Sequence, residues 1–495
     1  AFASPVIVML YFLPEVLSVV WGAQYNDKMM MVPNFSRAYE KSLTPELGFL
    51  FYQMESLSSY GLLYPPKPGS DPLRSKIGAW IPSNFLTALA TLPEAEQLQI
   101  LDGSPAAVDL PRRPEAFYRF LAYQLDKELS KYQSTTATPA TAAMETKLLD
   151  SLQGIDFICS NQFITGSSPP SHSTTRAMTL ELCYDTFLSN KGDENKKPIL
   201  KFGNLLQHSL CRETRLRAWN SKSKAYETIV QRKIVTSLPL VLTIACSCAG
   251  RKEDDGLWIW RADDTTEPWL PEMVEIELTE DGSHIVRQLA VNESGEQEWL
   301  TFSGQSPLPP AVSQLVSEVS TKQKRRYRLG AVLSFINDSV ISSVDDDISG
   351  HHVLHSRIPS SYKQRILKQQ TEMVTKLLTK EPNPSNNLVL TAGVKSEIYQ
   401  QRRDRAEHHL QACGGDDEMS SSWVLFNGFA VSNTTMEDAR TFHDSFKEPC
   451  LLIYRAIDND ETKCEMSNPT MSLPKVQIPP QVMNARSLAT GPSKT

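Results

Sequence analysis

The sequence predicts an α+β fold in which a helical lobe precedes an antiparallel sheet. Between residues 113 and 130, apolar side chains recur at helical spacing, with charged side chains between them. After residue 230 the apolar residues form short runs bounded by turn residues, which is the pattern of buried strands. Helices that precede strands, rather than alternating with them, are typical of α+β proteins. A chain of 495 residues with 40% hydrophobic residues can bury a large core.

Four helical segments are expected in the first 145 residues. They cover residues 6–16, 45–57, 84–100 and 113–130. The third has Asn84 at an N-cap-like position and should be interrupted at Pro93, because proline lacks the N–H that a helix interior needs. The stretch that follows them, 133–143, is rich in serine, threonine, alanine and proline and is expected to be a linker.

Strands are expected at residues 233–248, at 273–278 and, as a pair joined by a polar turn, at 292–305. An amphipathic helix is expected at 202–210. The strongest strand signal is a hairpin at 327–355, with an acidic turn at 345–347 that ends at Gly350. Residues 423–454 should close the core.

This hairpin resembles the histidine box of the ubiquitin-specific proteases. Tyr327, Leu329, Ala331 and Val332 match its first strand, and the Gly-His pair at residues 350–351 matches its second. The resemblance implies a papain-like cysteine-protease fold with a helical lobe, an antiparallel sheet and a fingers region. It places His351 at the position of the catalytic histidine.

A cysteine protease also needs a thiol and a group that orients the histidine. Trp423, Phe426 and Asn427 match the family's W-x-x-F-D, which puts Asn427 at the orienting position. The segment 6–16 matches the helix that follows the nucleophile, and counting back from it places Ala1 where the cysteine should be. No cysteine precedes Cys159. The resemblance therefore implies a vestigial site at Ala1, His351 and Asn427 with no catalytic residue.

Four motifs, LYFLPEV, PELGFLF, NFLTALATLPEA and WVLFNGF, resemble one branch of this family. That branch is the protease-like domain of the large subunits of the Pan poly(A)-specific ribonucleases. The resemblance implies a non-catalytic scaffold in mRNA poly(A)-tail shortening, located in the cytoplasm and its P-bodies. The implied partners are the exonuclease domain of the same full-length protein and a pseudokinase-like subunit, with poly(A) mRNA contacted only indirectly.

Relatives carry two CxxC zinc knuckles in the fingers region, and here that region is degenerate. Asn220 and Ser223 stand at cysteine positions, which leaves Cys159 and His172 as isolated ligand types. We therefore expect no zinc and no other cofactor, with magnesium needed only by the exonuclease. Cys246 and Cys248 share one strand face, so a metal or redox pair is one interpretation, and buried structural cysteines are the preferred one.

The expected domain organisation is a protease-like domain at 1–454 and a linker to an exonuclease at 455–495. Within the domain we expect a helical lobe at about 1–145, fingers and palm at about 150–358, an insertion at about 361–418 and closing strands at 421–454. The proline-containing, polar composition of the last segment favours a linker. Because no initiator methionine is present, we interpret the chain as a fragment.

The net charge of −7 argues against a protein that binds nucleic acid through its overall charge. Eight cysteines in this length favour reduced thiols in a cytosolic or nuclear protein. No apolar run reaches 18 residues, so no membrane association is expected. Two alternatives to the scaffold remain: an active deubiquitinase, and a module that binds ubiquitin without cleaving it.

Overall fold

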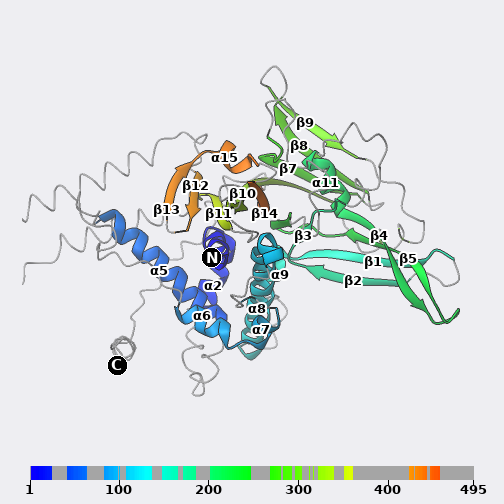
Figure 1. Cartoon of the computed structure of the whole chain (residues 1–495), viewed down its shortest axis with the longest axis horizontal. Coiled ribbons are helices and arrows are strands. Elements are labelled where there is room, and N and C mark those ends of the chain that lie inside the picture. The colour runs from blue at the N-terminus through cyan, green and yellow to red at the C-terminus, as the bar shows by residue number, and fades with distance from the viewer. Residues whose placement is uncertain are drawn as a thin grey trace, which may run out of the picture. The chain divides into compact units, whose positions relative to one another are not determined.

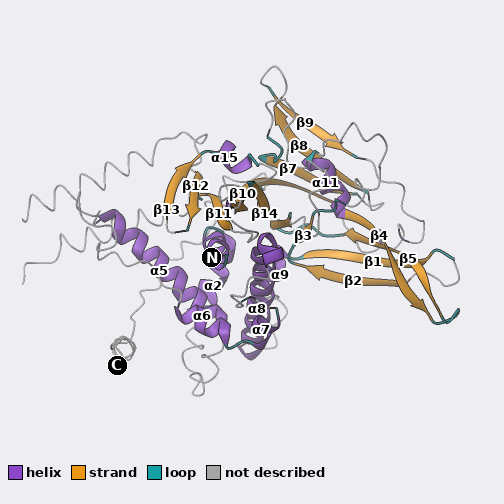
Figure 2. Cartoon of the chain, in the orientation of Figure 1, coloured by secondary structure: helices purple, strands orange, loops and turns teal. Residues whose placement is uncertain are grey.

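Helices come first along the chain and strands predominate after them, as Figures 1 and 2 show for the computed structural model. The chain divides into residues 1–457 and 458–495, and every residue that the structure describes belongs to the first unit. The described residues are 2–24, 42–63, 83–98, 100, 107–136, 148–165, 171–184, 201–246, 268–279, 283–291, 296–303, 312, 316, 322–338, 350–359, 423–428, 430–442 and 446–457. The expected insertion at 361–418 and the linker beyond 457 lie outside them.

The helical lobe contains α1 (Ala3–Tyr11), α2 (Pro14–Gln24), α5 (Leu43–Leu63), α6 (Ser83–Ala90), α7 (Pro93–Gln97), the 3-10 helix η2 (Ala107–Arg112), α8 (Arg113–Thr136) and α9 (Leu148–Gln153). The single helix expected at 6–16 is therefore wrong, because it is divided into α1 and α2. Pro14 cannot continue α1, since its ring would clash with the carbonyl four residues earlier, and it begins α2 instead. The interruption before Pro93 is confirmed, but α6 begins at Ser83, so Asn84 lies inside the first turn rather than at the cap.

A buried carboxylate joins two of these helices. Glu128 of α8 accepts hydrogen bonds from the backbone N–H groups of Leu43 and Thr44, at 3.0 and 2.8 Å, where α5 begins. The hydroxyls of Ser42 and Thr44 and the amide of Gln124 donate to the same carboxylate. The first N–H groups of a helix have no partner within the helix, so Glu128 caps α5 from a distant part of the sequence.

The main sheet has ten strands, ordered β13-β12-β11-β10-β14-β6-β3, with β7 also paired to β10 and followed by β8 and β9. Its strands are β3 (Leu180–Glu181), β6 (Val241–Ala245), β7 (Met273–Leu278), β8 (His284–Val291), β9 (Gln297–Phe302), β10 (Gln323–Asn337), β11 (Gly350–Arg357), β12 (Trp423–Asn427), β13 (Ala430–Thr434) and β14 (Lys447–Ala456). The hairpin at 327–355 is confirmed as β10 and β11. The strand pair expected at 292–305 exists, but its first strand, β8, lies before residue 292.

A second sheet of four strands, ordered β2-β1-β5-β4, forms the fingers (Figure 1). It contains β1 (Ile155–Phe163), β2 (Ser171–Ala177), β4 (Cys211–Asn220) and β5 (Ala225–Val235). The strand expected at 233–248 is divided, because its first residues end β5 and its later residues form β6. The helix α11 (Phe202–Leu210) lies where the sequence predicted it.

Both faces of the central strand β10 are buried. Ala331, Leu333 and Phe335 belong to the core shared with the helical lobe, whereas Tyr327 and Val332 belong to a second core with α11. A strand covered on both faces loses the alternation of apolar and polar residues, which explains the continuous apolar run in the sequence.

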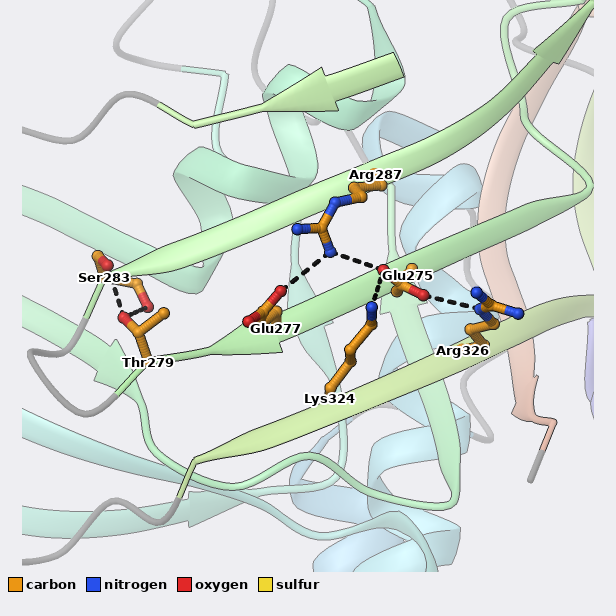
Figure 3. Close-up of polar contacts among 7 residues, drawn as sticks. All are labelled: Glu275, Glu277, Thr279, Ser283, Arg287, Lys324 and Arg326. Atoms are coloured by element: carbon orange, nitrogen blue, oxygen red, sulfur yellow. Dashed lines mark hydrogen bonds and ion pairs between the residues drawn. The ribbon is translucent and has the colours of Figure 1, made fainter. Parts of the chain in front are cut away.

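An ion-pair network joins β7, β8 and β10 (Figure 3). Oε1 of Glu275 lies 2.6 Å from Arg287 and 3.0 Å from Lys324, and Oε2 lies 2.7 Å from Arg326. Arg287 also reaches Glu277 at 3.0 Å. Burial opposes ionisation of Glu275, but the hydrogen bonds from the three cationic side chains outweigh it and lower its pKa. The network therefore holds three strands together through one buried carboxylate.

The closing segment contains β12, β13, the short helix α15 (Met436–Arg440) and β14. The strand β14 continues to Ala456, two residues beyond the expected end of the closing strands at 454. Arg455 is held at this end by Glu15 of α2, with Nη2 and Oε1 2.6 Å apart. Among the described helices, none is long and apolar enough to cross a membrane.

Candidate vestigial catalytic site

The histidine hairpin is built around Gly350. In the register of β10 and β11, Asn337 lies opposite Gly350 and Ile336 lies opposite His351. A Cβ at Gly350 would collide with the ring of Phe335 and would lie 2.5 Å from the carbonyl oxygen of Ile336. The glycine of the motif is therefore required by packing at this end of the hairpin, whatever the histidine does.

His351 takes a partner that the sequence analysis missed. Its Nδ1 lies 2.8 Å from Oδ2 of Asp338, the residue that follows β10, and both side chains are more than one-third exposed. A histidine ring whose Nδ1 faces a carboxylate is oriented as in a catalytic triad. The available signal was the position of Asp338, because in an antiparallel hairpin an acid just past Asn337 comes close to the residue after Gly350.

Asn427 does not orient this histidine. It lies at the end of β12, opposite Val353, and its side chain is exposed. No hydrogen bond joins Asn427 to His351 in the described part of the chain. Its neighbour Phe426 turns toward the helical lobe and contacts Phe12, with ring centroids 5.5 Å apart. Asn427 therefore lies on the strand next to the hairpin but does not make the expected hydrogen bond to His351.

The histidine that faces the helical lobe is His352. Side chains alternate along a strand, and Leu354, which shares a face with His352, belongs to the core formed with α1, α2 and α5. His352 is only 6% exposed, its Nε2 lies 3.0 Å from the carbonyl oxygen of Leu110, and its ring lies 5.3 Å from that of Phe335. The sequence motif thus places His351 at the position of the catalytic histidine, whereas in the structure it is His352 that faces the helical lobe.

Burial lowers the pKa of His352 to about 4, and the positive charge of Arg113 acts in the same direction. The hydrogen bond to the carbonyl of Leu110 opposes this shift without overcoming it. His352 is therefore neutral near pH 7. Because its Nε2 already faces a carbonyl, that nitrogen must carry the proton and is not free to accept one from a thiol.

Among the described residues, no thiol is hydrogen-bonded to either ring. Ala1, the position matched to the cysteine, lies outside the described residues. The described cysteines are Cys159, Cys183, Cys211, Cys246 and Cys450, and none hydrogen-bonds to His351 or His352. Cys246 is fully buried in the core with α11, as the preferred interpretation of the cysteine pair requires, and Cys248 lies outside the described residues.

The residues of the former knuckles do not fit a zinc ion. Asn220 ends β4, donates to Glu227 at 2.9 Å and accepts from the N–H of Lys222 at 3.0 Å, so it stabilises the β4–β5 turn. Cys159 of β1 lies opposite Lys233 of β5, which in turn lies opposite Arg212 of β4. Arg212 is eight residues along β4 from Asn220. Eight strand residues span about 27 Å, far beyond the reach of a shared metal. In the described residues, no three possible ligands gather.

A family model described as ubiquitin carboxyl-terminal hydrolase matches residues 1–431. The chain belongs to the ubiquitin carboxyl-terminal hydrolase family. This membership confirms the expected fold, with a helical lobe and an antiparallel sheet. Its histidine hairpin is formed by β10 and β11.

Within the ubiquitin carboxyl-terminal hydrolase family, the chain is similar to deadenylation subunits. The PAN2-PAN3 deadenylation complex catalytic subunit PAN2 of Gallus gallus is 24% identical to it over 92% of this chain and 33% of that protein. The Homo sapiens subunit of the same name is 25% identical over 53% of this chain and 19% of that protein. The chain thus spans about a third of the first relative's length, which confirms the predicted resemblance for this part.

Two solved structures share the fold. The Neurospora crassa Pan2 catalytic unit (protease and nuclease domain) matches with a TM-score of 0.50 and 15% identity over 92% of this chain and 55% of that chain. The Saccharomyces cerevisiae PAN2 pseudoubiquitin-hydrolase-RNase module matches with a TM-score of 0.50 and 16% identity over 92% of this chain and 51% of that chain.

Proposed function

We propose that this chain is the non-catalytic, ubiquitin-hydrolase-like part of a poly(A)-specific deadenylase subunit that shortens mRNA tails in the cytoplasm. Its role would be positional: it would hold an exonuclease domain of the same full-length protein and a pseudokinase-like partner subunit in a working arrangement. Similarity to PAN2 subunits over 92% of the chain supports this proposal.

The observation that carries the non-catalytic part of the proposal is the arrangement of the two histidines. Hydrolysis through a thiol needs one imidazole that is oriented on one side and open to the thiol on the other. His351 is oriented by Asp338 but lies on the strand face away from the helical lobe, whereas His352 faces the lobe but is buried against Leu110. Neither ring therefore meets both requirements. The sequence match adds Ala1 at the nucleophile position.

A positional role needs a stiff connection between the helical lobe and the end of the sheet. The ion pair of Arg455 with Glu15 supplies one, because it ties the last described strand to α2 just before the predicted linker. Glu128 and the network around Glu275 hold the lobe and the sheet internally. The last described strand is therefore held to the helical lobe.

The test measures shortening of an A-tailed RNA with magnesium present. Residues 1–495 alone should leave the RNA intact, whereas the full-length protein with its exonuclease should shorten it. In that protein, Leu238→Asp should weaken shortening, because it places a charge in the core shared with α11. His351→Ala and Asn427→Ala should leave the rate nearly unchanged, and they serve as matched controls in the vestigial site.

A ubiquitin probe with an electrophile at its C-terminus should form no adduct with residues 1–495. Labelling of a cysteine beside the histidine hairpin would show an active hydrolase and would refute the non-catalytic assignment. Loss of RNA shortening in the folded His351→Ala or Asn427→Ala protein would refute the positional role.

A further inference from the structure

Two large aromatic side chains are exposed at the outer end of the fingers. Trp219 of β4 lies directly opposite Tyr226 of β5, and these residues are 52% and 68% exposed. Their ring centroids lie 5.3 Å apart at an interplanar angle of 70°, so the rings meet edge to face. A protein gains stability by burying such rings, so their exposure together indicates a surface used for binding.

The same strand face carries two uncompensated arginines. Arg215 and Arg217 precede Trp219 by four and two residues, so all three side chains lie on one face of β4. Both arginines are exposed, and in the described part of the chain neither has an ion-pair partner. We call Arg215, Arg217, Trp219 and Tyr226 the fingertip surface.

The local charge differs in sign from that of the whole chain. Between residues 214 and 226 there are four basic residues and no acidic one, although the chain carries a net charge of −7. The nearest acids are already engaged: Glu213 pairs with Arg232 at 3.0 Å, and Glu227 accepts from Asn220 on the opposite strand face. The fingertip surface is therefore positive and complementary to an anionic ligand.

We propose that the fingertip surface binds single-stranded RNA. Bases can stack on Trp219 and Tyr226, because every base has a π-face, while the guanidinium groups of Arg215 and Arg217 bind phosphates. Successive positions on this face lie about 7 Å apart along β4, so the arginines and the tryptophan form a row that an extended strand can follow. The surface does not depend on the vestigial site, and the proposal goes beyond the positional role.

A protein ligand fits the surface less well. Aromatic residues that anchor protein interfaces are surrounded by contacts that exclude water. Here the neighbours on the same face are mixed: Thr228 lies opposite Arg217, Val230 lies opposite Arg215, and Lys224 lies in the turn. Cations that alternate with exposed rings are typical of sequence-tolerant binding to single strands.

The experiment uses fluorescence anisotropy of a labelled oligoadenylate of about 15 nucleotides, long enough for a single binding surface. The native chain of residues 1–495 should bind it. Trp219→Ala should weaken binding by about 5- to 150-fold, the usual loss of one stacked base. Arg215→Gln with Arg217→Gln should lower the slope of log affinity against log salt by about 1.4, the value for two phosphates on a single strand.

The matched control is Arg119→Gln with Tyr123→Ala, which removes one exposed arginine and one exposed tyrosine from α8. It should bind the RNA as the native chain does, and thermal melting should show all variants folded. The proposal is overturned if the native chain shows no binding at about 100 µM, the weak end of non-specific binding. It is also overturned if the fingertip variants bind RNA as tightly as the control does. That includes the outcome in which these variants lose binding to ubiquitin or to a partner subunit but still bind RNA.

Discussion

The cap that Glu128 places on α5 gives a sharp test of how the helical lobe is held. We expect Glu128→Gln to destabilise the folded chain strongly. The carboxylate is 7% exposed and accepts five hydrogen bonds: Ser42 Oγ, Thr44 N and Thr44 Oγ1 donate to Oε2, and Leu43 N and Gln124 Nε2 donate to Oε1. All five groups are donors, so the position requires an acceptor at both oxygens.

Glutamine can supply only one of these acceptors. If its carbonyl takes the position of Oε2, its NH₂ group faces two other donors, the N–H of Leu43 and the amide of Gln124. Each buried donor without an acceptor costs about 1–3 kcal/mol, so two of them should lower the free energy of unfolding by about 2–6 kcal/mol. The loss of negative charge at the start of α5 adds to the effect.

Urea unfolding followed by circular dichroism measures this change. The control is Glu94→Gln, which removes an acid of the same size from an exposed pair with Lys127 at 3.1 Å. That substitution should cost less than about 1 kcal/mol, as exposed ion pairs do. If Glu128→Gln costs no more than Glu94→Gln, the carboxylate does not cap α5 and the reasoning is wrong.

Three further predictions concern acid stability and metal content. The pKa of Glu275 is lower in the folded chain than its ordinary value of 4.5. The ionised carboxylate therefore stabilises the fold above pH 4.5, and this stabilisation is lost as the pH falls through the pKa of the folded state. Glu275→Gln should make the loss of stability below pH 4.5 less steep. The pKa of His352 falls from 6.5 to about 4, so the unfolded chain takes up a proton first and stability should decrease by about 3 kcal/mol from pH 6.5 to 4. Urea unfolding at both pH values should show no such decrease for His352→Gln. If the free energy of unfolding depends on pH equally in the variant and the native chain, the neutral ring is not buried as described. With Asn220 and Ser223 in place of knuckle cysteines, elemental analysis should find no zinc and a chelator should leave the melting temperature unchanged; about one zinc per chain would disprove this.

Local patterns predicted the elements whose signal is contained within a few residues. The helix α11 and the strand β7 have the expected bounds, because an amphipathic period of 3.6 and a short apolar run can be seen directly in the sequence. The prediction of a single strand at 233–248 was wrong because one apolar run continues from the fingers into the main sheet. Pro239 lies in the irregular stretch between β5 and β6. Periodicity cannot distinguish one long strand from two strands in different sheets.

The candidate site was predicted in part for the same reason. The motif identified the hairpin, and packing against Phe335 and Ile336 explains its glycine at position 350. It could not decide which of two adjacent histidines faces the helices, because a strand turns successive side chains to opposite faces and the register is set by pairing with β10. Nor could it find Asp338, which precedes His351 by 13 residues in the sequence.

By itself, the sequence determined that a helical lobe precedes the main strands, that a buried strand begins the histidine hairpin, and that the chain resembles a hydrolase family, since these depend on residue types and their spacing. Only the tertiary structure decided which side chains meet: Glu128 with the start of α5, Asp338 with His351, and Trp219 with Tyr226. The physical reason is that such contacts depend on strand register and on the packing of elements far apart in the chain. A single-residue change of register would move every one of a strand's side chains to the other face.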